Sequence, residues 1–424
     1  MPQQLTPNPA AAAAQRDALA QALKVFVRPA RHAGAAAGPL AGWTVALKDN
    51  IDVAGDVVEV GTRLFAGRRA TTTASAARRL LDAGATLDGR TQLVELCFGS
   101  FGINEYTGTA RNPWDASTPR APGGSSGGSA VAVAARLVRA ALGSDTAGSI
   151  RMPAALCGIT GFKPTFGRVP TDGVFPLAPG YDSVGPMAVD AADCAALMAV
   201  LAADPSLAAP ALPARPRIAV LPPRLWPAAV EPAVEEAAQA AAGVFRASGF
   251  ELHEVDAAPD FAALTQQAGV LIAAGAWSVL REDFERRESD FGPALRERML
   301  AARLITAEAV AENTEARARA ARAFEAWASG FDALLLPTVG CTAPALADVQ
   351  ERGTTLGHFT RWVNHVGGCA ISLPAGFDGR GLPVAVQLVG RGGSDATVLA
   401  LGQAFQAATD WHARVPSFLP TTGA

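Results

Sequence analysis

The stretch APGGSSGGSAVAVAARLVRAALGSDTAGSIRMP, from Ala121 to Pro153, decides how the whole chain is interpreted. Two Gly/Ser turns, residues 123–129 and a second that ends at Ser149, enclose a segment rich in alanine. Glycine costs backbone entropy and adds nothing to a core, so paired turns indicate places where the backbone approaches another group closely. Residues 129–142 contain neither proline nor glycine, which predicts a helix that begins at the first turn. The alternative is a pair of ordinary loops.

Strand and helix patterns alternate on both sides of this stretch. Predicted strands cover residues 44–47, 85–93, 217–221, 250–256, 331–338 and 381–390, and predicted helices cover residues 74–81 and 230–247. The last two strands are apolar runs bounded by Gly and Pro, as expected of strands buried on both faces of a sheet. The charge-dense residues 281–328 are predicted to form solvated helices without chemistry of their own. This alternation predicts an α/β fold.

The length of the chain bounds its domain organisation. With 424 residues, half of them hydrophobic, it can form one large domain or two to three smaller ones. Residues 202–216 are rich in Pro and Ala and poor in charge, which marks a surface crossing. Residues 217–424 then complete the core begun before the crossing. We therefore predict a single domain over residues 1–424.

The composition of the chain limits the kinds of partner that it is expected to bind. A formal net charge of -3 gives no electrostatic footprint for nucleic acid or an anionic membrane surface. The five cysteines are scattered, without a CxxC pair or an HExxH motif, so we expect no metal and a cytoplasmic location. Residues 1–31 lack the pattern of a signal peptide and are predicted to form a short surface helix. No stretch reaches the roughly 20 uninterrupted apolar residues of a membrane span.

The first turn has two interpretations that come from other classes of protein. Residues 123–127, GGSSG, satisfy the G-x-S-x-G pattern of an α/β-hydrolase elbow, which predicts an esterase with Ser125 as the nucleophile. That elbow must follow a strand directly and needs a downstream Asp and His, whereas two prolines stand shortly before Ser125. A phosphate-binding turn is the other interpretation. The chain lacks the Gly-Lys-Ser/Thr ending and a GxGxxG after a strand that such turns use.

In the third interpretation both turns belong to one site that contains Ser125 and Ser149. The proton acceptor of this site is a lysine, Lys48, because the chain has few histidines. Residues 122–173, from PGGSS to VPTDG, resemble the signature of the amidase signature family, and VALKDNIDVAG, residues 45–55, resembles its upstream lysine segment. The resemblance is close over residues 42–203 and returns in ALLLPT, residues 333–338, and GLPVAVQLVG, residues 381–390. It implies a single α/β/α sandwich around a large mixed, mostly parallel β-sheet.

The resemblance also assigns catalytic roles. It implies that Ser149 is the nucleophile, that Ser125 and Lys48 relay its proton, and that the peptide bond between Gly124 and Ser125 is cis. The two serines are 24 positions apart, as the family pattern requires. The implied oxyanion hole consists of the backbone amides of Thr146, Ala147, Gly148 and Ser149, where Ala147 replaces a glycine common among relatives.

Further positions match the signature or its surroundings. Gly124 and Tyr106 are predicted substrate contacts, and the acyl pocket is expected among residues 101–108, residues 171–183 and the loops around Gly340 and Asn364. Three charged residues are interpreted as scaffold: Asp145, Arg151 and Lys163. The resemblance implies no cofactor.

Lys48 can act as a base only when it is neutral. A serine hydroxyl is a poor nucleophile and needs a neighbouring proton acceptor. Deprotonating a free lysine at pH 7 costs roughly 4–5 kcal/mol, so burial must lower the pKa of Lys48 for the relay to work. The alternative role for Lys48 is a surface ion pair with Asp49.

Taken together, these residues predict an amidohydrolase that cleaves a carboxamide C–N bond through an acyl-enzyme on Ser149, with esters or carbamates as side substrates. The leaving group, whether ammonia, an arylamine or a carbamate amine, stays open. The alternative within the family is the glutaminase subunit of a tRNA-dependent amidotransferase. The expected partner is a small-molecule amide, and a homodimer is compatible with the sequence.

Overall fold

The computed structural model describes residues 9–350, 356–416 and 418. The β-strands in this part of the chain are β1 (Phe26–His32), β2 (Thr44–Lys48), β3 (Thr86–Thr91), β4 (Ala140–Asp145), β5 (Thr160–Lys163), β6 (Ser183–Ala188), β7 (Arg217–Val220), β8 (Glu251–Glu254), β9 (Ala333–Pro337), β10 (Cys369–Phe377) and β11 (Pro383–Gly390). The α-helices are α1 (Pro9–Ala22), α2 (Ser75–Asp82), α3 (Gly127–Ala134), α4 (Arg151–Leu156), α5 (Ala191–Leu201), α6 (Pro232–Ala247), α7 (Phe261–Arg287), α8 (Pro293–Arg303), α9 (Ala307–Ala328), α10 (Arg361–His365) and α11 (Asp395–Ala407).

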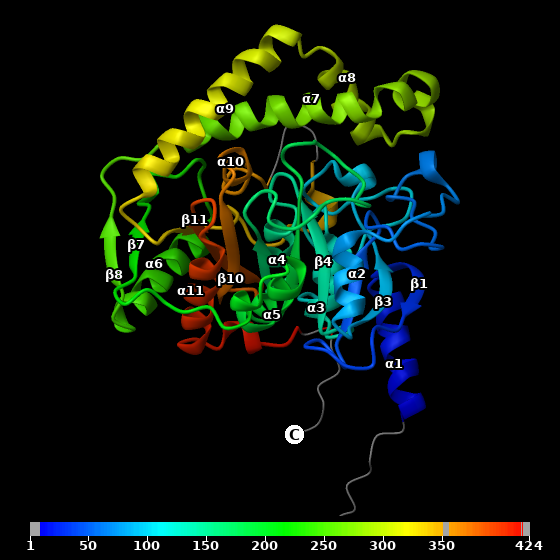
Figure 1. Cartoon of the computed structure of the whole chain (residues 1–424), viewed down its shortest axis with the longest axis horizontal. Helices are drawn as coiled ribbons and strands as arrows, with labels where there is room; N and C mark the ends of the chain where they lie inside the picture. The colour runs from blue at the N-terminus through cyan, green and yellow to red at the C-terminus, as the bar shows by residue number, and fades with distance from the viewer. Residues whose placement is uncertain (1–8, 351–355, 417, 419–424) are drawn as a thin grey trace, which may run out of the picture.

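These strands form one sheet of 11 strands that extends from β1 at one edge to β8 at the other (Figure 1). Its order is β1-β3-β2-β4-β6-β5-β10-β11-β9-β7-β8. The sheet is mixed, as predicted. The expectation of mostly parallel pairs needs correction, because four neighbouring pairs are parallel and six are antiparallel. One cause is local: the tight turn from Asp378 to Leu382 joins β10 to β11, and two strands joined in this way must run antiparallel.

Helices cover both faces of the sheet, so the fold is the predicted α/β/α sandwich. On one face α2, α5, α6 and α11 pack through apolar side chains such as Leu80, Leu197, Phe245 and Phe405. On the other face α3 packs against β2 and β4, and α4 packs against β5, β10 and β11. Farther along that face Trp362 of α10 contacts Phe261 of α7 and Phe324 of α9, in an apolar cluster that also includes side chains of β7 and β9. The strands of both halves of the chain therefore share one core.

Residues 129–142 are not the single helix predicted above. Helix α3 ends at Ala134, Arg136 adopts a φ of 56°, and β4 begins at Ala140. The N–H of Arg136 donates to the carbonyl of Val133, which closes the end of the helix. Strand β4 then pairs with β2 and β6 and is buried throughout. These long-range pairings override the helix propensity of its alanines.

Helices α7, α8 and α9 lie across one end of the sheet, next to α10 (Figure 1). They contain the charge-dense residues 281–328, which are largely helical as predicted. By length and composition the helix Phe261–Asp290 could cross a membrane, and 33% of its most apolar window is buried inside the molecule. This is weak evidence, because core helices pass the same test. The absence of a membrane partner stays a prediction.

Candidate active site

Lys48 lies at the end of β2 and is fully buried. Its Nζ is 2.7 Å from Ser125 Oγ and 2.8 Å from Ser144 Oγ. Burial lowers the pKa of Lys48, and the adjacent Cys97 thiol is the largest influence in the opposite direction. The lowered pKa favours the neutral amine, which is the form that can accept a proton.

Ser125 and Ser149 come from the two Gly/Ser turns, which the fold brings together. Ser125 is fully buried and accepts a hydrogen bond from Lys48. The N–H of the next residue, Ser126, donates to the carbonyl of Ser149 at 3.2 Å. Ser149 stands between β4 and α4 and lines a cavity. The turn of Ser125 therefore contacts Lys48 on one side and the turn of Ser149 on the other.

Glycine allows these turns to pack closely. The peptide bond between Gly124 and Ser125 is cis, as the resemblance implied. Gly123 adopts a φ of 78°, and a Cβ there would lie 2.7 Å from the Cα of Pro153. Gly148 adopts a φ of 118°, and a Cβ there would lie 2.1 Å from Thr360 Oγ1. Both distances are shorter than real Cβ contacts, so side chains at these positions would push the two turns out of place.

The loop that was expected to form the oxyanion hole, residues 146–149, is held from two sides. The N–H of Gly148 donates to Asp145 Oδ1 at 2.8 Å. The carbonyl of Ala147 accepts from Thr360 Oγ1 at 2.7 Å. The expectation of four oxyanion amides is therefore reduced to three, because the Gly148 amide already donates to a carboxylate at the end of β4.

The three residues interpreted as scaffold, Asp145, Arg151 and Lys163, make buried ion pairs or hydrogen bonds. Asp145 and Arg151 are both fully buried, and Arg151 Nε is 3.1 Å from Asp145 Oδ2. Burial is the largest influence and would raise the pKa of Asp145, but Arg151, Lys163 and the hydrogen bond from Asn364 together lower the pKa to about 2. Lys163 Nζ donates to the carbonyls of Pro164 and Gly368, each at 2.7 Å, and burial lowers its pKa to about 8.

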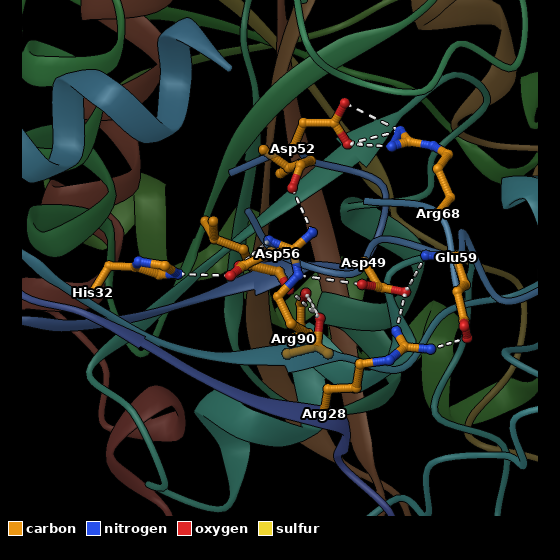
Figure 2. Close-up of polar contacts among 12 residues, drawn as sticks. Arg28, His32, Asp49, Asp52, Asp56, Glu59, Arg68 and Arg90 are labelled. Carbon is orange, nitrogen blue, oxygen red and sulfur yellow. Dashed lines mark hydrogen bonds and ion pairs between the residues drawn. The ribbon is translucent and has the colours of Figure 1, made fainter. Parts of the chain in front are cut away.

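A network of charged residues surrounds Asp49, the residue that follows Lys48 in the chain (Figure 2). Asp49 accepts hydrogen bonds from Arg90 Nε at 3.2 Å and from Arg28 at 3.3 Å. Burial raises the pKa of Asp49, and the two arginines oppose that shift. Figure 2 also shows Arg28 with Glu59, Arg68 with Asp52, and His32 with Asp56. Because Lys48 is buried and Asp49 pairs with arginines, the alternative of a surface ion pair between Lys48 and Asp49 is wrong.

A cavity of about 220 Å³ opens at Ser149. Its walls come from the segment after β3, from the loop between β4 and α4, from the segment between β5 and β6, and from α4, α7, α8 and α10. Its described lining residues are Cys97, Phe98, Gly99, Ser100, Ala147, Ser149, Met152, Leu177, Gly269, Ile272, Arg298 and Arg361. The charged side chains in this described lining are both arginines.

The structure does not bring the two predicted substrate contacts into this cavity. Tyr106 is 40% exposed, lies under the guanidinium of Arg63 and lines a different cavity. The N–H of Gly124 donates to the carbonyl of Ser100 at 2.7 Å, so Gly124 supports the lining without being part of it. Among the expected pocket loops, residues 171–183 contribute Leu177, and Arg361 lies three positions before Asn364.

Sequence reasoning missed several residues of the site. Ser144 accepts hydrogen bonds from both Lys48 and Asn50. Asp182 accepts from the hydroxyl of Thr146, and burial raises the pKa of Asp182 to about 6. Ser144 and Asp182 stand inside stretches that the sequence had singled out, but nothing local marks them. Their partners are up to 96 positions away along the chain, so no local pattern could have found these contacts.

The five cysteines all lie in the described part of the chain. Each of them is free, and four are buried. Within the described residues, no group of three or more His, Cys, Asp or Glu side chains is placed to hold a metal ion.

Comparisons with known proteins show which family the chain resembles. The family model described as Amidase matches residues 5–399. The A-type subunit of glutamyl-tRNA(Gln) amidotransferase from Chloroflexus aggregans is 36% identical over 427 aligned residues, covering 91% of this chain and 86% of the relative. A crystal structure described as an amidase has 31% identity and a TM-score of 0.81, covering 95% of this chain and 91% of the other. The structure of 6-aminohexanoate cyclic dimer hydrolase has 27% identity and a TM-score of 0.86, covering 97% and 95%.

Proposed function

The chain belongs to the amidase family, whose hydrolases act on C–N bonds, and from this premise we propose that it hydrolyses a small carboxamide through an acyl-enzyme on Ser149. The observation that carries the proposal is the contact of 2.7 Å between the fully buried Nζ of Lys48 and Ser125 Oγ. It supports the proposal because the amine of Lys48, whose pKa is lowered, contacts the turn of Ser125, and that turn contacts the turn of Ser149.

In the acylation step, neutral Lys48 accepts the hydroxyl proton of Ser125 while Ser125 takes the proton of Ser149. The Ser149 oxygen then attacks the amide carbon and forms a tetrahedral intermediate. The proton returns through Ser125 to the leaving amine as the C–N bond breaks. A water molecule hydrolyses the resulting ester by the same relay in reverse, which regenerates Ser149 and releases the acid.

The negative oxygen of the tetrahedral intermediate needs preorganised donors. We propose that the backbone amides of Thr146, Ala147 and Ser149 supply them, since the Gly148 amide donates to Asp145. The hydrogen bond from Thr360 to the Ala147 carbonyl supports this role, because it holds the loop in one orientation.

Two features argue against an esterase with Ser125 as the nucleophile. Ser125 is fully buried and hydrogen-bonded to Lys48, and it is not among the described residues that line the cavity. Ser149 does line the cavity, where a substrate carbonyl could reach it. Esters and carbamates remain proposed side substrates, because the same nucleophile and relay can act on their acyl carbons.

A second candidate function is that of a glutaminase within a larger amidotransferase. It is favoured by one observation, the 36% identity to the A-type subunit of a glutamyl-tRNA(Gln) amidotransferase. The catalytic residues would be the same. The cavity argues for a free-standing amidase, because its described lining contains two arginines and no carboxylate to receive the ammonium group of glutamine.

Replacing Ser149 with Ala tests the proposed nucleophile. Turnover of a carboxamide should fall by at least about 1,000-fold, because no acyl-enzyme can form, while the circular dichroism spectrum stays that of the parent. A serine-directed phosphonate should label the parent and fail to label the variant.

Trypsin separates the two candidate serines, which makes the label easy to locate. Cleavage after Arg120 and Arg136 places Ser125 in one peptide, and cleavage after Arg139 and Arg151 places Ser149 in another. We expect the adduct in the second peptide, with fragment ions that assign it to Ser149. An adduct on Ser125 would overturn the assignment in favour of the esterase.

A further inference from the structure

Two guanidinium groups line the Ser149 cavity from different elements. Arg298 lies on α8, and its NH1 donates to the carbonyl of Phe98 at 2.8 Å. Arg361 is the first residue of α10. The two arginines are 63 positions apart in the chain, and the packing of α8 and α10 brings both to the cavity that holds the nucleophile.

The fold leaves space for Arg361 at this place. Gly269 on α7 also lines the cavity, and a Cβ there would lie 3.2 Å from Arg361 NH1. A larger residue at position 269 would therefore crowd the guanidinium. Burial lowers the pKa of Arg361, which means that its charged form loses hydration in the fold. A carboxylate bound in the cavity would form a charge-assisted hydrogen bond with this guanidinium.

The remaining described lining is apolar or small, apart from Ser100, Ser149 and Cys97. No Asp or Glu is among these described lining residues, so a cationic substrate group would meet two like charges. Arg298 also borders a neighbouring cavity whose lining includes Glu95 and Glu297. Of these two cavities, Arg361 lines only that of Ser149, which makes it the arginine most specific to the site.

We propose that Arg361, together with Arg298, forms an anion subsite beside Ser149 and selects amides whose acyl part carries a carboxylate. The planar guanidinium forms paired hydrogen bonds with a carboxylate, so it recognises shape as well as charge. This inference rests on the proposed amidase function and adds the charge of the substrate to it. It also predicts that an amide with a free ammonium group is a poor substrate.

Three amides of similar length test the subsite with ammonia as the common leaving group. They are succinamate, which carries a carboxylate, butanamide, which is neutral, and 4-aminobutanamide, which carries an ammonium group. We expect kcat/KM to decrease in that order for the parent enzyme. In Arg361→Gln the ratio of kcat/KM for succinamate to that for butanamide should fall by about 10- to 100-fold, mainly through KM, because a charge-assisted hydrogen bond is lost.

Two further variants separate recognition from folding. Arg298→Gln should lower the same ratio, and it keeps the test valid if the Arg361 variant is poorly folded. Arg303→Gln removes an exposed charge from the same helix, α8, and should leave the ratio unchanged. Thermal unfolding of each variant shows whether the fold is retained.

The outcomes distinguish this inference from the proposed function. Hydrolysis of butanamide as efficient as that of succinamate, or a ratio unchanged in both cavity variants, overturns the anion subsite and leaves the amidase function intact. If none of the amides is hydrolysed, calorimetric titration of Ser149→Ala with succinamate still decides the subsite. The subsite is supported if succinamate binds Ser149→Ala and binds the double variant Ser149→Ala/Arg361→Gln at least 10-fold more weakly. It is overturned if succinamate does not bind Ser149→Ala, or binds both variants equally.

Discussion

Lys48 and Lys163 show how neighbouring atoms give two buried lysines different roles. Both are fully buried, and burial lowers the pKa of each. Lys163 donates to two backbone carbonyls, which can only accept, so its contacts favour the charged ammonium. Lys48 instead contacts the hydroxyls of Ser125 and Ser144, which can accept from an ammonium or donate to a neutral amine. Only the environment of Lys48 suits a group that must take up and return a proton.

The titration of Lys48 can be followed directly, because the chain contains only three lysines, Lys24, Lys48 and Lys163. Lysine labelled with 13C at Cε should give three NMR signals, and the signal lost in Lys48→Arg belongs to Lys48. We expect it to titrate below the value of about 10.4 for a free lysine. For a neutral amide, kcat/KM should rise with pH along the same curve, since deprotonation creates the base.

Lys163 provides an internal control in that experiment. Its signal should titrate near pH 8, where burial places its pKa, without a matching change in kcat/KM. If the Lys48 signal stayed that of an ammonium throughout the pH range of activity, the proposed relay would have to be abandoned.

The junction of β4 and α4 shows how one carboxylate organises an element boundary. Asp145 ends β4 and accepts from the N–H groups of Gly148 and Ile150 and from the side chain of Arg151. Asn364 at α10 donates to the same carboxylate at 2.9 Å. The carboxylate therefore joins a strand, the loop of the nucleophile, a helix start and a distant helix. Such a buried charge is strongly coupled to the fold.

Asp145→Asn should destabilise the protein by about 3–5 kcal/mol, because it leaves the buried guanidinium of Arg151 without its counter-charge. Denaturant-induced unfolding measures the loss as a shift of the midpoint. The matched control is Asp193→Asn, which breaks the 2.9 Å ion pair with the half-exposed Arg139 and should cost less than about 1 kcal/mol. Equal losses for the two variants would contradict the structural role given to Asp145.

At the scale of the whole molecule, one sheet connects the two halves of the chain. Strand β5, from the first half, pairs with β10, from the second, in the middle of the strand order. The cavity is shared in the same way, since Ser149 comes from the first half and Arg298 and Arg361 from the second. The groups proposed for binding and chemistry thus lie within this one chain.

We therefore expect the purified chain to hydrolyse a small carboxamide without ATP, tRNA or a second protein, and to prefer it to glutamine. The reason is electrostatic. The arginines can pair with the α-carboxylate of glutamine, but the described lining offers no carboxylate to its ammonium group, which lies on the same carbon. Ammonia released from glutamine and from an amide panel measures the preference. Activity on glutamine alone, and only after a partner protein is added, would instead support the glutaminase.

Much of the fold and of the reaction centre could be predicted from the sequence. The two turns of residues 121–153 and the segment of Lys48 are contiguous motifs, so their residue types and spacing identify the amidase family without coordinates. Elements with a clear apolar pattern, such as the apolar runs of β9 and β11 and the amphipathic α6, lie close to their predicted positions. Local patterns carry this information because they reflect which face of an element is buried.

Only the tertiary structure decided which distant groups meet. The helix predicted over residues 129–142 extends into the first half of β4, and the pairing of β4 with β2 and β6 overrides that local propensity. Arg298 belongs to a run predicted to have no chemistry, and it reaches the cavity only through the packing of α8. The lowered pKa of Lys48 depends on burial, and its contact with Ser125 spans 77 positions. Burial and long-range contacts are properties of the assembled core, so no local stretch of sequence encodes them.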